Sequence, residues 1–200
     1  MASKTQDKET GRLEAFSDGV FAFAITLLVL DLKDPTQAAG NTASLLQGLY
    51  NEWPTFFAFV TSFMTILIMW IGHHQMFNYV HKIDRRFMFF NGFLLFFVTL
   101  TPFTTSLVGN HITHVDSSTA ASVYAGSFLL LASSWNLLWR RASQGGRLLR
   151  SDVTPEEIRT MRRNFYIGPI VYAAALVLSF VSGLAALGLM FAVAVFYAVS

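Results

Sequence analysis

The chain has 200 residues, of which 54% are hydrophobic and only 13% are charged, and its formal net charge is +2. Soluble domains usually carry about 25% charged residues, and the long apolar blocks here lack the polar faces that a soluble helical bundle needs. The composition argues against an ordinary soluble domain and predicts an all-α membrane protein, while the absence of cysteine excludes disulfides, thiolate nucleophiles and cysteine metal sites.

Six apolar segments have the length of membrane-spanning helices, since a bilayer core of about 30 Å needs roughly 20 helical residues. Residues 1–11 precede them as a polar, cytoplasmic N-terminus that we expect to be disordered. Residues 34–52 form a polar loop in which 43–50 suit a short amphipathic helix. Residues 12–200 form the transmembrane domain, with predicted spans at 12–32, 54–78, 87–108, 119–139, 164–181 and 184–200.

Basic residues are confined to alternate connections between these spans. Of the 14 lysines and arginines, all but Lys33 fall in the N-terminal segment and in the second and fourth connections. Basic loops face the cytoplasm, so we expect a multi-pass protein of the cell membrane with both termini cytoplasmic. In the fourth connection, residues 154–157 read Thr-Pro-Glu-Glu, a capping box that predicts a helix running from Pro155 into the fifth span.

The first span differs from the others because only this span contains acidic residues. At about 100° per residue, an apolar stripe gathers within about 40° of one line, and Asp18 lies about 140° away. Thr26 lies at the edge of this stripe. The stripe consists of Phe16, Gly19, Phe23, Leu27 and Leu30.

Asp18 needs polar partners, because ionisable groups inside a membrane are costly and face a bundle interior or water. We expect those partners at the same depth in the second and third spans, with Arg12 joining the layer. The candidates are Trp70, His73, His74 and Asn91. Asp18 is then either a hydrogen-bonded anchor or part of a proton or ion relay.

The pattern Arg12, Phe16-Ser17-Asp18, Ala22 and Thr26 resembles the signature of the transmembrane protein 175 family of potassium channels. The six-span pattern and the Trp70 to His74 segment are similar to that family as well. So are Asn91 and residues 100–103, and the resemblance therefore covers most of the chain.

This resemblance implies a potassium-preferring cation channel that conducts passively, as a homotetramer whose first helices line a central pore without a pore loop. It implies a hydrophobic gate at Phe23, Leu27 and Leu30, and selectivity at Thr26. It also implies membrane lipids as partners, potassium and other monovalent cations as permeants, and no cofactor. The implied structural network consists of Arg12, Phe16, Ser17, Asp18, Trp70, His73, His74 and Asn91.

Other interpretations of the first span remain open at this point. Phe23 departs from the family resemblance, which implies a smaller aliphatic residue there, so a ring of four phenylalanines would narrow or close the pore, or add a cation–π attraction. The stripe is also compatible with lipid contact or core packing. The Thr26 hydroxyl is compatible with a bond to the preceding turn of its own helix.

The alternative function is a proton-permeable channel or a proton-coupled transporter that uses Asp18 and the nearby histidines, and a scaffold without transport activity is a third. We expect no enzyme, because no nucleophile–base motif is present. We expect no metal site at the histidine pairs, which supply too few ligands. Nucleic acid is not needed to explain the basic loop over 140–163, for which positive-inside orientation and anionic-lipid contact suffice.

Overall fold

The computed structural model describes residues 2–34 and 44–199, and apart from an isolated bridge between Val80 and Leu149 all the regular structure in these ranges is helical. Two short 3₁₀ helices, η1 (Leu28–Asp31) and η2 (Gln144–Gly146), follow the first and fourth long helices. The α-helices are α1 (Ala2–Leu27), α3 (Leu45–Asn51), α4 (Trp53–Tyr79), α5 (Arg85–His111), α6 (Ser117–Ser143), α7 (Pro155–Ser179) and α8 (Gly183–Val199).

The N-terminal segment is helical, so the expectation of disorder over residues 1–11 was wrong for residues 2–11. Helix α1 begins at Ala2 and continues without a break into the apolar span. Adding residues to an existing helix costs little, because nucleation is the expensive step. This segment holds no proline, and Gly11 is its only glycine.

Four helices are long and apolar enough to cross a membrane in the part of the chain that the structure describes. They cover Glu9–Asp31, Trp53–Tyr79, Arg85–His111 and Ser117–Gly146. Helix α8 is apolar but has only 17 residues, and α7 carries its arginines in its first turns. Both helices occupy the positions of the predicted fifth and sixth spans. Helix α3 nearly coincides with the short amphipathic helix predicted over 43–50. Residues 35–43 of the predicted loop lie outside the described residues.

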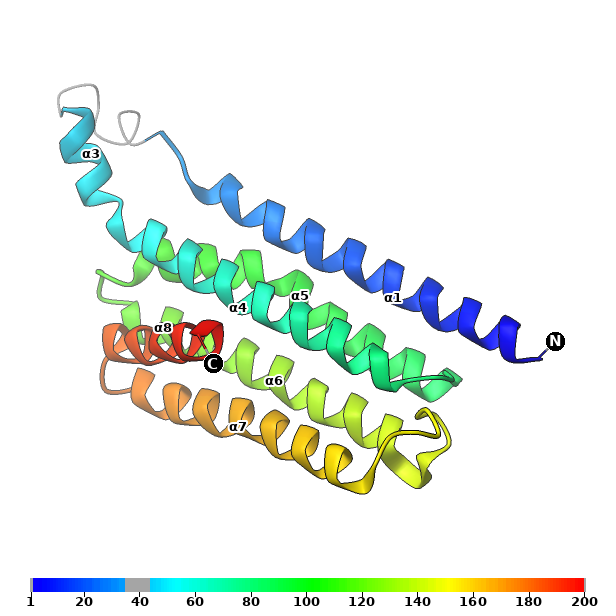
Figure 1. Ribbon diagram of the computed structural model, residues 1–200. Helices are drawn as coiled ribbons and strands as arrows, with labels where there is room; N and C mark the ends of the chain where they lie inside the picture. The colour runs from blue at the N-terminus through cyan, green and yellow to red at the C-terminus, as the bar shows by residue number, and fades with distance from the viewer. Residues whose placement is uncertain (1, 35–43, 200) are drawn as a thin grey trace.

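Helix α1 lies at one edge of the bundle, beside α4 and α5, and α7 lies on the opposite side (Figure 1). Helix α6 packs against α5, α7 and α8. Only 22% of the apolar window in Glu9–Asp31 is buried, against 50% in Ser117–Gly146. Most of the surface of α1 therefore remains uncovered by its own chain.

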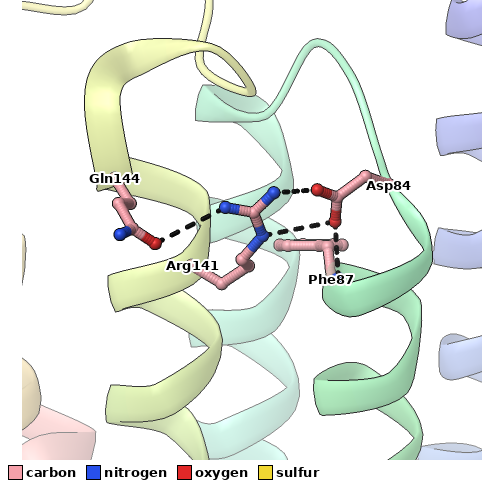
Figure 2. A network of polar contacts seen from close by, with 4 residues as sticks. All are labelled: Asp84, Phe87, Arg141 and Gln144. Carbon is pink, nitrogen blue, oxygen red and sulfur yellow. Dashed lines mark hydrogen bonds and ion pairs between the residues drawn. The ribbon is translucent and has the colours of Figure 1, made fainter.

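The two basic connections are tied to each other at one end of the bundle. The backbone N–H of Arg150 donates to the Tyr79 carbonyl at 3.0 Å, beside the bridge between Val80 and Leu149. Asp84 caps α5 by accepting from the Phe87 N–H at 2.8 Å, and Arg141 at the end of α6 pairs with the same carboxylate (Figure 2).

The predicted capping box at the start of α7 is confirmed. Thr154 Oγ1 accepts from the Glu157 N–H at 3.3 Å, and the Glu157 carboxylate accepts from the Thr154 N–H at 2.8 Å. Helix α7 runs from Pro155 to Ser179 without interruption, as the sequence predicts.

Candidate functional site

Helix α1 has a buried face and an exposed face, and the two divide the first span. Every third or fourth residue packs against α4 and α5, which follows from the helical period. These buried residues are Ser17, Phe21, Ala24 and Leu28. The exposed face carries the predicted stripe, in which Phe23 is 62% and Leu30 is 70% exposed.

Two polar pairs join the middle of α1 to the C-terminal part of α4. Trp70 Nε1 donates to the Asp18 carboxylate at 2.9 Å, and His74 Nδ1 lies 3.0 Å from the Glu14 carboxylate. Trp70 and His74 are also stacked, with ring centroids 6.3 Å apart. Each helix contributes residues four positions apart, which lie on one face. The order of the pairs shows that α1 and α4 are antiparallel.

A buried chain of hydrogen bonds joins α4, α5 and α1. His73 Nε2 lies 2.9 Å from Asn91 Oδ1, Asn91 Nδ2 donates to Ser17 Oγ at 2.9 Å, and Ser17 Oγ donates to the Leu13 carbonyl at 2.9 Å. The three side chains are fully buried. Because the Asn91 oxygen can only accept, His73 must carry a proton on Nε2. In the hydrogen bonds of this series that join two helices, each donor therefore lies on the α4 side and each acceptor on the α1 side.

Aromatic rings enclose His73 on its other sides. The ring of Phe77 stacks on it at 4.5 Å, and the rings of Phe21 and Trp135 lie 5.3 and 5.9 Å away. His73 Nδ1 finds no hydrogen-bond partner among the described residues. The imidazole thus acts as a donor toward Asn91 inside an otherwise apolar packing arrangement.

Thr26 lies on the exposed face of α1, and its hydroxyl donates to the Phe23 carbonyl at 2.8 Å. This is the local bond that threonine commonly forms in a helix. The hydroxyl proton is used in this way, but both lone pairs of the oxygen remain free to accept. Leu27 on the same side is half-buried.

The structure brings together six residues of the predicted network, and it leaves Arg12 and Phe16 on the exposed side of α1. Arg12 forms no hydrogen bond or ion pair with any residue that the structure describes. The residues in contact are Ser17, Asp18, Trp70, His73, His74 and Asn91.

Glu14 is the member of the site that the sequence analysis missed. Its signal was the four-residue spacing to Asp18, which matches the spacing from Trp70 to His74 on the opposing helix. Within residues 2–34 and 44–199, no group of three or more His, Asp or Glu side chains could hold a metal ion. The site therefore consists of an exposed apolar stripe backed by hydrogen bonds to α4 and α5.

The family model for the endosomal/lysosomal potassium channel TMEM175 matches residues 12–102. A potassium channel of Chamaesiphon minutus is 42% identical over 198 residues, which cover 99% of this chain and 98% of the relative. The chain belongs to the TMEM175 family. The resemblance found in the sequence is thereby confirmed.

Further members of the TMEM175 family share the fold or part of the sequence. The crystal structure of a lysosomal potassium-selective channel TMEM175 homolog from Chamaesiphon minutus matches with a TM-score of 0.88 at 42% identity, over 96% of this chain and 97% of the other. An endosomal/lysosomal proton channel TMEM175 of Danio rerio is 39% identical over 102 residues, which cover 48% of this chain and 20% of the relative.

These TMEM175 relatives are ion channels, which confirms that the chain is not an enzyme. Together with the four apolar helices, family membership makes the chain a multi-pass membrane protein. The fold is that of the family, and its first helix presents an uncovered apolar face.

Proposed function

We propose that four copies of this chain form a potassium-preferring cation channel of the cell membrane, with one central pore lined by the α1 helices. Each copy crosses the membrane six times, and both termini are cytoplasmic. The channel needs no pore loop and no cofactor, and potassium is its principal permeant. The segregation of lysine and arginine into alternate connections supports this topology.

The division of α1 into two faces carries the proposal. One face packs against α4 and α5, while Phe23 and Leu30 on the stripe are mostly exposed in the part of the chain that the structure describes. A large exposed apolar surface marks a contact with lipid or with another subunit. Thr26 on this surface offers free lone pairs, which suit a surface that cations pass.

The gate works by excluding water from a narrow apolar constriction formed by Phe23, Leu27 and Leu30. Such a constriction dewets and is a barrier to all hydrated ions. Potassium gives up its hydration water more readily than sodium, and the Thr26 oxygens replace part of that shell. Preference for potassium is therefore modest, and permeation is passive.

The polar network holds α1 in register with α4 and α5, so that the stripe keeps its orientation. The pairs Asp18–Trp70 and Glu14–His74 and the buried bonds of Ser17 and Asn91 supply this attachment. In the tetramer, Arg12 and Phe16 complete the same layer.

Purified protein reconstituted into planar bilayers tests the proposal. With potassium on one side and sodium on the other, the reversal potential should shift toward that of potassium. Silent bilayers containing folded tetramer would contradict the proposal, and so would a reversal potential at zero. A folded dimer or monomer that conducts would contradict the tetramer alone.

Proton permeation is the second candidate, favoured by the Danio rerio relative's name and by the two carboxylates at the interface between α1 and α4. In vesicles under a pH gradient, the substitution Asp18→Asn should then abolish proton flux without loss of folding. The partner substitution Trp70→Phe leaves the carboxylate in place and should preserve flux. Unchanged flux in well-folded Asp18→Asn protein would exclude a relay through Asp18.

A further inference from the structure

A groove of about 1230 Å³ runs over α6 between α5 and α7, at the end of the bundle that carries the basic connections. Its walls come from residues 85–90, 137–144 and 158–166, and none of them belongs to α1. Helices α5 and α7 both pack on α6, so the groove is the space that they leave between them. It is therefore distinct from the proposed pore.

Arginines from all three helices line this groove, and no acidic residue is among the described residues that line it. Arg141 is held by Asp84 and by Gln144, whose Oε1 lies 3.5 Å from Arg141 Nη1 (Figure 2). The remaining four arginines form no ion pair or hydrogen bond with the described residues. They are Arg85, Arg86, Arg140 and Arg162. Since guanidinium groups bind phosphate in a bidentate fashion, this unbalanced positive charge calls for a phosphate-bearing partner.

Apolar side chains share the walls and continue along the same helix faces. Phe89, which is 75% exposed, and Tyr166, which is 46% exposed, lie in the groove itself. Residues four or seven positions further along α5 and α7 lie on the same faces, and several of these are exposed too. They are Phe93, Phe96 and Ile170. The arginine-lined groove is thus continuous with exposed apolar surfaces on α5 and α7. This pattern fits an amphiphile better than a soluble anion.

We propose that this groove binds an anionic phospholipid. The phosphate lies among the arginines of α5, α6 and α7, and the acyl chains follow the exposed faces of α5 and α7. Basic pockets between membrane helices are the kind of site that anionic headgroups occupy. Arg141, fixed by Asp84, forms one wall, and the unpaired arginines turn toward the lipid. The proposal does not depend on conduction, because lipid retention is measured without current.

The test counts lipids retained by the purified full-length protein from mixed micelles with equal amounts of phosphatidylglycerol and phosphatidylcholine, by native mass spectrometry. The triple substitution Arg86→Gln, Arg140→Gln and Arg162→Gln removes one groove arginine per helix. The matched control, Arg147→Gln, Arg159→Gln and Arg163→Gln, removes the same charge from exposed residues outside the groove.

The wild type and the control should both retain phosphatidylglycerol in preference to phosphatidylcholine. The groove variant should retain it with an affinity lower by roughly tenfold or more, since each arginine near the surface adds to the attraction for an anionic headgroup. The single substitution Arg162→Gln should give a smaller loss with no effect on folding, which the thermal unfolding midpoint verifies.

Three results would overturn the proposal. Equal losses in both triple variants would mean that surface charge alone attracts the lipid. No enrichment on the wild type would mean that another copy of the chain or another protein covers the groove. Displacement of the lipid by glycerol phosphate as efficiently as by short-chain phosphatidylglycerol would assign the site to soluble phosphates.

Discussion

At the scale of single residues, the Thr26 hydroxyl donates its proton within its own helix, while its oxygen is still able to accept a hydrogen bond. The proton is donated to the Phe23 carbonyl, and the Thr26 oxygen keeps its capacity to accept hydrogen bonds. The local bond, which offers an ordinary explanation for a threonine in an apolar helix, also leaves the oxygen available for the proposed contact with a cation. The two interpretations of Thr26 are therefore compatible.

The substitution Thr26→Ala should lower the permeability ratio of potassium over sodium by about two- to tenfold, since one oxygen ligand per subunit is lost. Bi-ionic reversal potentials in planar bilayers measure this ratio. Thr99→Ala is the matched control, because the exposed Thr99 hydroxyl on α5 forms the same bond, to the Phe96 carbonyl at 2.8 Å. Equal ratios for Thr26→Ala and Thr99→Ala would remove Thr26 from the selectivity mechanism.

Ser17 is the link through which the buried polar chain reaches α1. In Ser17→Ala, the amide nitrogen of Asn91 loses its acceptor at a fully buried position. We expect a loss of stability of about 1–3 kcal/mol, the cost of an unsatisfied buried donor. Differential scanning fluorimetry of the detergent-solubilised protein measures this as a lower unfolding midpoint.

Ser133→Ala provides the comparison for Ser17→Ala. The Ser133 hydroxyl bonds only to the Leu129 carbonyl of its own helix, so its removal leaves no buried donor without a partner. An unfolding midpoint for Ser17→Ala that is no lower than that of Ser133→Ala would show that the hydrogen bonds from His73 through Asn91 to Ser17 contribute no stability.

At the scale of elements, the interface between α1 and α4 could be predicted in part from the sequence. Asp18 is an isolated acid in an apolar helix, so its need for partners and their depth followed from the cost of burying charge. Glu14 was overlooked because it lies in the first turns of the predicted span, where an acidic residue can simply be solvated. The four-residue spacing acquires meaning only once the antiparallel pairing with Trp70 and His74 is known.

The contacts between the two basic connections could not be predicted. Arg141 and Asp84 are 57 residues apart, and the sequence offers many other arginines for the same carboxylate. The start of α1 was mispredicted because polarity was taken as a sign of disorder. The polar composition of residues 2–11 suits contact with water, but it does not prevent the helix of the first span from extending over them, since extending a helix costs little.

Asp84 makes the link between α5 and α6 sensitive to acid. The hydrogen bond from Arg141, and then that from the Phe87 N–H, lower the pKa of the Asp84 carboxyl from its ordinary value of 3.8. The ionised Asp84 carboxylate therefore contributes fully to the free energy of unfolding at pH values above the ordinary pKa. This contribution is lost as the pH falls through the lowered pKa.

The substitution Asp84→Asn should reduce stability at neutral pH and remove this part of the acid dependence. Unfolding midpoints across a pH series measure both effects. Asp116→Asn is the control, since Asp116 precedes α6 without a side-chain capping bond. If Asp84→Asn and the wild type lose stability in parallel as the pH falls, the acid sensitivity comes from other groups.

At the scale of the whole molecule, the position of α1 at the edge of the bundle is the feature on which the proposed assembly of four copies rests. A helix that buries 22% of its apolar window and presents Phe23 and Leu30 outward is incompletely packed as a monomer. Helix α6, by contrast, packs against α5, α7 and α8, and half of its apolar window is buried. The proposed ion pathway therefore lies outside the single chain, at the axis of the proposed tetramer.

Accessibility of substituted cysteines during current recording tests this claim most directly, and the natural absence of cysteine gives a clean background. Leu30→Cys on η1, which continues α1, is compared with Val177→Cys on α7, because these positions are 70% and 68% exposed. A water-soluble, positively charged thiol reagent should block potassium current through Leu30→Cys channels and leave Val177→Cys channels conducting. Full current through Leu30→Cys channels that mass spectrometry shows to be labelled would contradict the assignment of the pore to α1.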